Sequence, residues 1–157
     1  MDVIAVAAVA ENGIIGDGPT LPWDLPNEVQ RYRDRVAGET VVIGRRTFEM
    51  FDDPPGARRI VLSRTEREYN DPTVDHAKSV DEAIETARSD GVSTLYVLGG
   101  AAIYEAFLPY YDRMLLSRVD GEYDGDARFP SFDEREWVLR DRQDYDGYTL
   151  ETWDRDG

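Results

Sequence analysis

The sequence predicts an α/β protein built on a mostly parallel sheet, and three observations carry this prediction. Five short apolar runs lack the polar alternation of a sheet with one wet face, so they are typical of strands covered on both faces. Segments with helical periodicity alternate with these runs, as in crossover connections. The last part of the chain instead holds two strand-like segments in succession, which indicates a closing antiparallel hairpin.

The predicted elements follow one another in a regular order. The apolar runs are VIAVAAVA (3–10), TVVIG (40–44), RIVLS (59–63), TLYVLGG (94–100) and RMLLSRV (113–119). Four helices are expected at Pro26–Val36, Arg45–Phe51, Val80–Arg88 and Ala101–Leu108. Proline at a first helical position sacrifices no hydrogen bond, and Ser79 is a suitable N-cap for the third helix. The closing hairpin is expected from REWVLRDR (135–142) and DGYTLETWD (146–154).

Composition limits the class of protein. The 157 residues, 41% of them hydrophobic, suit a single domain over residues 1–157 with a real core. The chain has no cysteine and one histidine, His76, which excludes disulfides and thiolate metal sites and disfavours a histidine metal site or a Ser-His-Asp triad. The apolar N-terminal run is too short for a membrane span and lacks a basic flank. We therefore expect a soluble, cytoplasmic protein without a metal.

The charge is strongly negative. Thirty-three acidic residues against 18 basic ones give a formal charge of −15, which argues against nucleic acid or anionic membranes as partners. Lys78 is the only lysine, so nearly all positive charge is arginine. The repulsion of such a surface is largely screened at about 1 M salt, where the Debye length is roughly 3 Å. The composition is typical of a halophile, and we expect the folded state to need high salt.

Two strand-to-helix junctions suggest an anion site. In open α/β sheets, ligands bind beyond the carboxyl ends of strands, where helix N-termini offer free N–H groups. IGRRTFE (43–49) places two arginines at one such junction, and VLGGAAIYEAF (97–107) places two glycines at another. Each junction alone could be surface counter-charge or a tight turn, but together with SRT (63–65) they indicate a split phosphate site. The chain contains no G-x-G-x-x-G fingerprint and no P-loop.

Glu28 is the carboxylate that most needs an explanation. It lies in the first helix, about 40° around the axis from Tyr32, at the margin of the apolar stripe. One interpretation is a first-turn glutamate favoured by the helix dipole. The other is a half-buried carboxylate that meets a ligand.

The order of the motifs resembles the dihydrofolate reductase family from nearly end to end. After the first apolar run come GIIG (13–16), LPWDLPNE (21–28), IGRRTFE (43–49), IVLSR (60–64), LGGAAIYEAFLP (98–109) and YDGDARFP (123–130). The resemblance implies one domain with a mostly parallel mixed sheet of about eight strands, about four flanking helices and a C-terminal antiparallel hairpin. It also implies a monomer that reduces dihydrofolate to tetrahydrofolate by hydride transfer from NADPH to C6, with protonation at N5 assisted by Glu28.

The resemblance further assigns the site residues. Glu28 and Trp23 are the implied catalytic residues, with the indole N–H of Trp23 joined to Glu28 through water and the hydroxyl of Ser117 bonded to the same carboxylate. Substrate-binding positions are Val6, Ala8, Leu21, Glu28, Val29, Tyr32, Phe51, Leu98, Tyr104 and Ser117. Cofactor-binding positions are Ala8, Ile15, Gly16, Gly44, Arg45, Arg46, Thr47, Leu62, Ser63, Arg64, Leu98, Gly99, Gly100, Ala101, Ala102, Ile103 and Tyr104.

Within these sets, Ala8 and Ile15 are expected to present backbone groups to the nicotinamide carboxamide, and the loop from Gly16 to Leu21 to close over that junction. Arginines at the adenosine end favour the 2′-phosphate of NADPH over NADH.

Two departures from the family pattern leave questions open. Ala101 and Ala102 follow the glycine pair where the family often has a third glycine and a basic or polar residue, so pyrophosphate binding must rely on backbone amides. The position of the family's arginine for the folate α-carboxylate falls on Ala57, and the sequence leaves open whether Arg58, Arg59 or neither takes its place.

Two other functions stay open from the sequence. One is a reductase of the same fold from the riboflavin pathway, against which Pro22-Trp23 with Glu28 discriminates. The other is a noncatalytic nucleotide-binding or salt-adapted structural protein.

Overall fold

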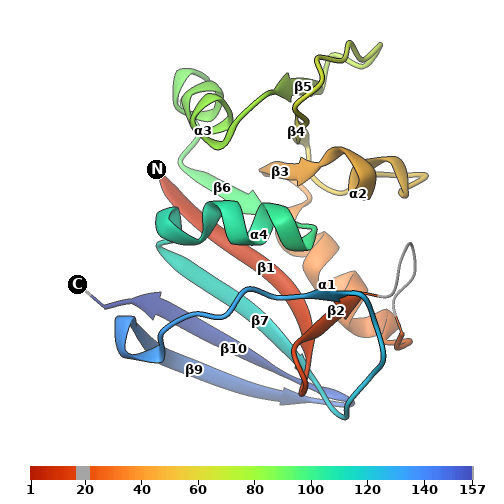
Figure 1. Ribbon diagram of the computed structural model, residues 1–157, viewed down its shortest axis with the longest axis vertical. Helices are drawn as coiled ribbons and strands as arrows, with labels where there is room; N and C mark the ends of the chain where they lie inside the picture. Colours follow the sequence, from red (N-terminus) through yellow and green to blue (C-terminus); the bar gives the residue numbers. More distant parts are fainter. Residues whose placement is uncertain (17–21, 157) are drawn as a thin grey trace.

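The computed structural model describes residues 1–16 and 22–156, which form an eight-stranded sheet in the order β5-β4-β3-β6-β1-β7-β10-β9 (Figure 1). The strands are β1 Asp2–Ala10, β3 Thr40–Gly44, β4 Arg58–Leu62, β5 Val74–Ala77, β6 Thr94–Val97, β7 Arg113–Val119, β9 Trp137–Tyr145 and β10 Tyr148–Arg155. The pairs from β5 to β7 are parallel, and β10 runs antiparallel to both β7 and β9. A small second sheet pairs β2 Ile14–Gly16 with β8 Ala127–Arg128.

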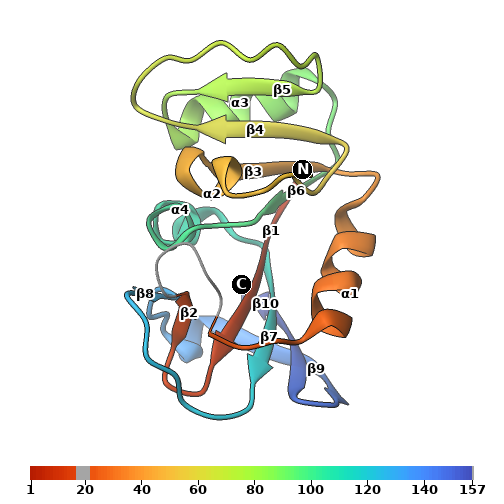
Figure 2. The same ribbon diagram turned by 90° about the vertical axis from the view of Figure 1, so that its right-hand side faces the viewer.

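Helices cover both faces of the sheet. They are α1 Pro26–Val36, α2 Arg45–Glu49, α3 Val80–Ser89 and α4 Ala101–Phe107, with short 3₁₀ turns η1 Leu108–Tyr110 and η2 Glu134–Glu136. In Figure 2, α4 and α1 lie on opposite sides of β1. The main core includes side chains of α3 and α4, and a second cluster joins β3 and β4 to the α2 side. The predicted fold class is confirmed.

Local sequence explains why these elements begin and end where they do. The hydroxyl of Ser79 accepts a hydrogen bond from the N–H of Glu82, so it caps α3 as expected. Helix α2 ends at Glu49 rather than Phe51, because the N–H groups of Met50 and Phe51 bond three residues back in a tightened last turn. The structure has no helix long and apolar enough to span a membrane in the residues it describes.

Some strand predictions need correction. The fourth run was expected to extend to Gly100, but β6 ends at Val97, because Gly99 has a φ of 104° that leaves the strand conformation. The third run is shifted by one residue, to Arg58–Leu62. β2, β5 and β8 were not predicted. β5 reads VDHA, four residues of which two are polar, so its strand conformation comes from pairing with β4 rather than from an apolar pattern.

This topology places the ends of several parallel strands together. β3 and β6 are neighbours, and the N–H of Gly44, the last residue of β3, donates to the carbonyl of Gly99, two residues after the end of β6, at 2.8 Å. The helices α2 and α4 start from these same two strand ends. The site is therefore expected at this edge, between α1 on one side and the start of α4 on the other.

Candidate active site

A cleft of about 410 Å³ lies at the predicted edge of the sheet. Its walls come from β1, α1, the end of α2 and the start of α4. The lining residues are Val6, Ala7, Ala8, Ile15, Glu28, Val29, Tyr32, Arg33, Thr47, Met50, Phe51, Leu98, Gly100, Ala101, Tyr104 and Ala127. Within this described lining, Glu28 is the only carboxylate and Arg33 the only cation, so the cleft is mostly apolar with two charged groups. Such a cleft suits a flat organic ring that presents hydrogen-bond donors.

Glu28 is more deeply buried than its place on the helix suggested. The residue is 5% exposed, whereas the helical wheel indicated half burial. Burial raises the pKa of the Glu28 carboxyl, while the hydrogen bond from Ser117 and the charge of Arg35 oppose that rise. A carboxyl group in this setting holds its proton to higher pH than a free glutamate does.

Trp23 and Ser117 are the two residues expected to act on Glu28, and the structure treats them differently. Trp23 is buried against Ala10, Ile14 and Val119, and its ring meets that of Tyr123 edge-on at 5.4 Å between centroids. Its indole N–H is buried and has no partner among the described residues. Ser117 bonds Glu28 from β7 and does not line the cleft itself. The water link from Trp23 to Glu28 stays a prediction.

Tyr104 ties the start of α4 to the cleft wall. Its hydroxyl donates to the carbonyl of Val6 at 2.7 Å, and its own carbonyl accepts a hydrogen bond from the hydroxyl of Tyr111 at 3.0 Å. Burial raises the pKa of the Tyr104 hydroxyl, so the group stays a neutral donor. The first bond joins α4 to β1 at the cleft wall, and the second joins α4 to the segment that precedes β7.

The structure gathers most of the predicted substrate positions. Val6, Ala8, Glu28, Val29, Tyr32, Phe51, Leu98 and Tyr104 all line the cleft. Ser117 stands behind Glu28, and Leu21 lies outside the described residues, as does most of the loop expected to close over the site.

The predicted cofactor positions divide into two groups. Ala8, Ile15, Thr47, Leu98, Gly100, Ala101 and Tyr104 line the cleft. Gly16, Gly44, Arg45, Arg46, Leu62, Ser63, Arg64, Gly99, Ala102 and Ile103 lie outside its lining, most of them at the ends of β3, β4 and β6 or in the first turns of α2 and α4.

Glycine is required where the two strand ends approach each other. A Cβ on Gly99 would lie 2.9 Å from Cε2 of Tyr104, at a φ that side chains rarely adopt. A Cβ on Gly100 would lie 3.2 Å from Oγ1 of Thr47, and one on Gly44 would lie 2.9 Å from Cγ1 of Ile103. These three glycines leave the backbone open between α2 and α4.

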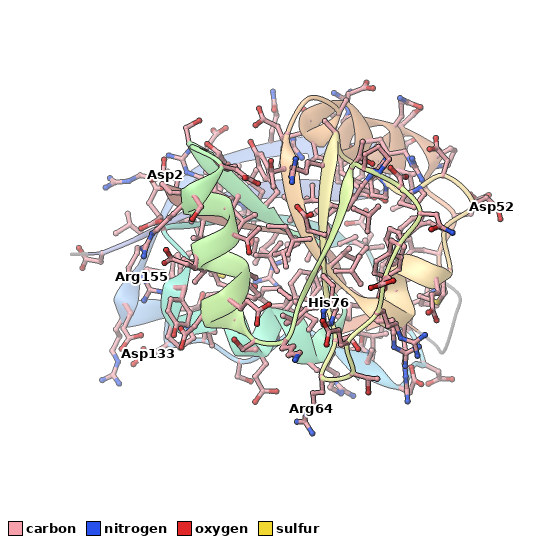
Figure 3. The ribbon with its side chains drawn as sticks, turned by 90° about the horizontal axis from the view of Figure 1, so that it is seen from above. Asp2, Asp52, Arg64, His76, Asp133 and Arg155 are labelled. Atoms are coloured by element: carbon pink, nitrogen blue, oxygen red, sulfur yellow. The ribbon has the colours of Figure 1, made fainter. Side chains whose placement is uncertain are left out.

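The three arginines predicted to bind the cofactor near the ends of β3 and β4 differ in whether they form an ion pair. Arg45 is paired with Glu49 on its own helix at 3.1 Å. Arg46 and Arg64 are exposed and form no ion pair with any residue in the described part of the chain. In Figure 3, Arg64 points away from the body of the protein. No described residue therefore competes with an anion for these two guanidinium groups.

Arg58 and Arg59 lie on opposite faces of β4 and make different contacts. Arg58 pairs with Asp75 at 2.6 Å and with Asp90, at the end of α3, at 3.2 Å. Arg59 lies on the other face of β4 and donates to the carbonyls of Pro54 at 2.6 Å and Pro55 at 3.2 Å, and to Thr73. Neither arginine lines the cleft.

Arg33 is the cation that the sequence reasoning missed. It lines the cleft, its guanidinium lies 5.5 Å from the ring centroid of Phe51, and it donates to the carbonyl of Asp53 at 2.9 Å. Its spacing from Val29 is four residues, one helical turn on the same face, so helical periodicity could have found it. Ala7, Met50 and Ala127 were missed as well.

In the described residues, an α/β sheet carries an apolar cleft with a buried carboxylate, and two arginines near the strand ends form no ion pair; this combination is typical of an enzyme that binds a ring-shaped substrate beside an anionic nucleotide. A family model described as dihydrofolate reductase matches residues 2–154, and the chain belongs to this family. The resemblance seen in the sequence is thereby confirmed, and the protein is an enzyme of the dihydrofolate reductase class.

Relatives from salt-loving archaea and a solved structure agree with this assignment. The chain is 38% identical to dihydrofolate reductase HdrB of Haloferax volcanii, over 97% of this chain and 82% of that protein. It is 33% identical to dihydrofolate reductase 1 of Haloarcula marismortui, over 95% and 89%. The structure of dihydrofolate reductase from Enterococcus faecalis complexed with NADP(H) and RAB-propyl superposes with a TM-score of 0.85, at 26% identity, over 99% of this chain and 97% of that one.

Proposed function

We propose that this protein catalyses the NADPH-dependent reduction of 7,8-dihydrofolate to 5,6,7,8-tetrahydrofolate, with Glu28 assisting protonation at N5. The observation that carries the proposal is the buried carboxylate of Glu28, which has no other carboxylate beside it in the described lining of an apolar cleft in a dihydrofolate reductase fold. The Enterococcus faecalis relative in complex with NADP(H) supports the choice of cofactor.

The residues present fit this cofactor. Gly44, Gly99 and Gly100 keep side chains out of the gap between α2 and α4, where the dinucleotide would pass. Arg46 and Arg64 would meet the 2′-phosphate, and Ala8 and Ile15 would offer backbone groups to the nicotinamide carboxamide. Bound NADPH supplies the hydride that C6 of the substrate receives.

Glu28 would hold the substrate ring and handle the proton. Burying a carboxylate is costly unless it meets donors, and the amino-pyrimidine edge of a pterin offers N–H donors in the same plane. The raised pKa lets Glu28 keep a proton at a pH where an exposed glutamate has lost it, which favours protonation at N5. Ser117 would orient the carboxylate from β7, and the buried indole N–H of Trp23 would join Glu28 through a water molecule.

The rest of the cleft would hold the remainder of the substrate. Val29, Phe51 and Leu98 offer apolar contacts to a benzoyl ring. Arg33 would bind the carboxylate tail, because it lines the described part of the cleft, whereas Arg58 and Arg59 do not. Arg33 on α1 would thus supply the guanidinium that the family has at the position of Ala57.

We further propose that residues 1–157 form one domain that acts as a monomer in the cytoplasm. The eight-stranded sheet contains strands from both ends of the described chain, which supports one domain. The charge of −15 supports the absence of nucleic acid and membrane partners.

A turnover assay tests the proposed reaction. The absorbance of NADPH is followed with dihydrofolate at molar potassium chloride, with each compound omitted in turn as a control. We expect NADPH loss only when both are present. NADPH binding without turnover of dihydrofolate would refute the proposal and favour a noncatalytic nucleotide-binding protein.

A further inference from the structure

We propose that His76 is a positioning residue for the 2′-phosphate end of the site, because its ring holds the peptide that carries Arg64. The proposal rests on the proposed function, in which Arg64 meets the 2′-phosphate of NADPH. His76 lies on β5, half-buried, and its Nε2 lies 2.9 Å from the carbonyl oxygen of Ser63. Figure 3 shows His76 and Arg64 on adjacent segments of one edge, with Arg64 directed outward.

The hydrogen bond between His76 and the carbonyl of Ser63 lies just beyond the point where β4 stops pairing with β5. β4 ends at Leu62, and the N–H of Ser63 still bonds the carbonyl of Ala77 at 3.0 Å. The next peptide unit, between Ser63 and Arg64, has its carbonyl oxygen fixed by His76 instead. Because a peptide unit is planar, fixing that oxygen also fixes the N–H and Cα of Arg64. His76 thereby sets the direction in which the arginine leaves the sheet.

The carbonyl acceptor determines which nitrogen of the His76 ring carries a hydrogen in this bond. A carbonyl oxygen only accepts, so Nε2 of His76 must carry the hydrogen and donate. Glutamine can offer an amide N–H near the position of Nε2, whereas phenylalanine keeps the ring shape and offers no donor. These two substitutions therefore separate the hydrogen bond from the packing of the ring.

The neighbouring contacts leave His76 as the main restraint on this peptide. The next charged contact between the two segments joins Lys78 to Glu66 at 3.7 Å, and both side chains are largely exposed, so it restrains little. Arg64 is exposed and forms no ion pair with any described residue. Its guanidinium is free for a phosphate, and a fixed backbone lowers the ordering cost of that contact.

The test compares His76→Phe, His76→Gln, Arg64→Ala and the double variant His76→Phe/Arg64→Ala. Binding of 2′,5′-ADP and of 5′-AMP to the free protein is measured by calorimetry at one fixed salt concentration, and KM is measured for NADPH and NADH. We expect His76→Phe to weaken 2′,5′-ADP binding and raise KM for NADPH by about 3- to 10-fold, with 5′-AMP, NADH and kcat little changed. His76→Gln should restore most of the loss, and in the Arg64→Ala background His76→Phe should add little.

Asp75→Asn is the matched structural control. It alters the same strand from the opposite face, where Asp75 pairs with Arg58, and should lower the melting temperature without changing the preference for 2′,5′-ADP over 5′-AMP. Equal losses for both probes in His76→Phe, or an unchanged preference, would overturn the proposal. An additive double variant would overturn it too. Because the binding measurement needs no turnover, it reports on His76 even if the proposed reaction fails.

Discussion

Replacing Glu28 by glutamine should make the protein more stable and much less active at neutral pH. The side chain keeps its shape and loses its charge. General acid–base groups typically contribute about 10²- to 10⁴-fold to a rate, and no other carboxylate lines the described cleft to take over. We therefore expect kcat to fall within that range at neutral pH. The loss should shrink in acid, where solution supplies the proton.

The stability effect follows from the raised pKa. Below the unfolded pKa, near 4.5, Glu28 is neutral in both states and the variant should match wild type. As pH rises from that value through the higher folded pKa, the unfolded state loses its proton first, so wild type loses stability by about 1.4 kcal/mol per unit of pKa difference. Glutamine does not titrate, so the variant escapes this loss.

Rates and melting temperatures from about pH 4 to about pH 9 at fixed molar potassium chloride test both effects. Ser117→Ala is the matched variant, because it removes a hydrogen bond that lowers the pKa of Glu28. Its activity should therefore persist to higher pH than that of wild type. The reasoning is refuted if Glu28→Gln has the wild-type rate throughout, or if it is no more stable than wild type at neutral pH.

Three further outcomes are expected. Arg33→Gln should raise KM for dihydrofolate by about 10-fold with kcat kept. Arg31→Gln should not, because Arg31 on the same helix lies over the ring of Tyr145 and is not among the described lining residues of the cleft. An equal effect of Arg33→Gln on a pterin without a carboxylate tail would remove Arg33 from that role. Tyr104→Phe should leave the carbonyl of Val6 without its donor and cost about 1–3 kcal/mol, a drop of roughly 2–10 °C in melting temperature; an unchanged transition would contradict the importance of that bond. The melting temperature should rise strongly from low to molar potassium chloride, because salt screens a net charge of −15; a flat curve would contradict the salt argument.

The sequence was most informative where local chemistry decides the structure. Pro26 and the periodicity after it predicted the bounds of α1, and the same helix placed Glu28 beside Tyr32. The burial of Glu28 was underestimated, because Ser117, which bonds the carboxylate, comes from β7, a strand distant in sequence. A helical wheel cannot show how much such a strand covers the carboxylate.

Structural features that depend on how the strands pair were harder to predict from the sequence. The roles of Arg58 and Arg59 depend on which face of β4 each occupies, and the register with β3 and β5 fixes that only in the fold. β5 was missed because its few residues carry no apolar pattern. His76 carried no signal in the sequence, since its partner is a backbone carbonyl.

The most direct test of the central claim is a crystal structure of this protein with NADP⁺ and a folate in the cleft. The account predicts that the carboxylate of Glu28 faces the amino-pyrimidine edge of the bound ring, with the guanidinium of Arg33 at the carboxylate tail. A Glu28 side chain turned into solvent, away from the bound ring, would contradict it.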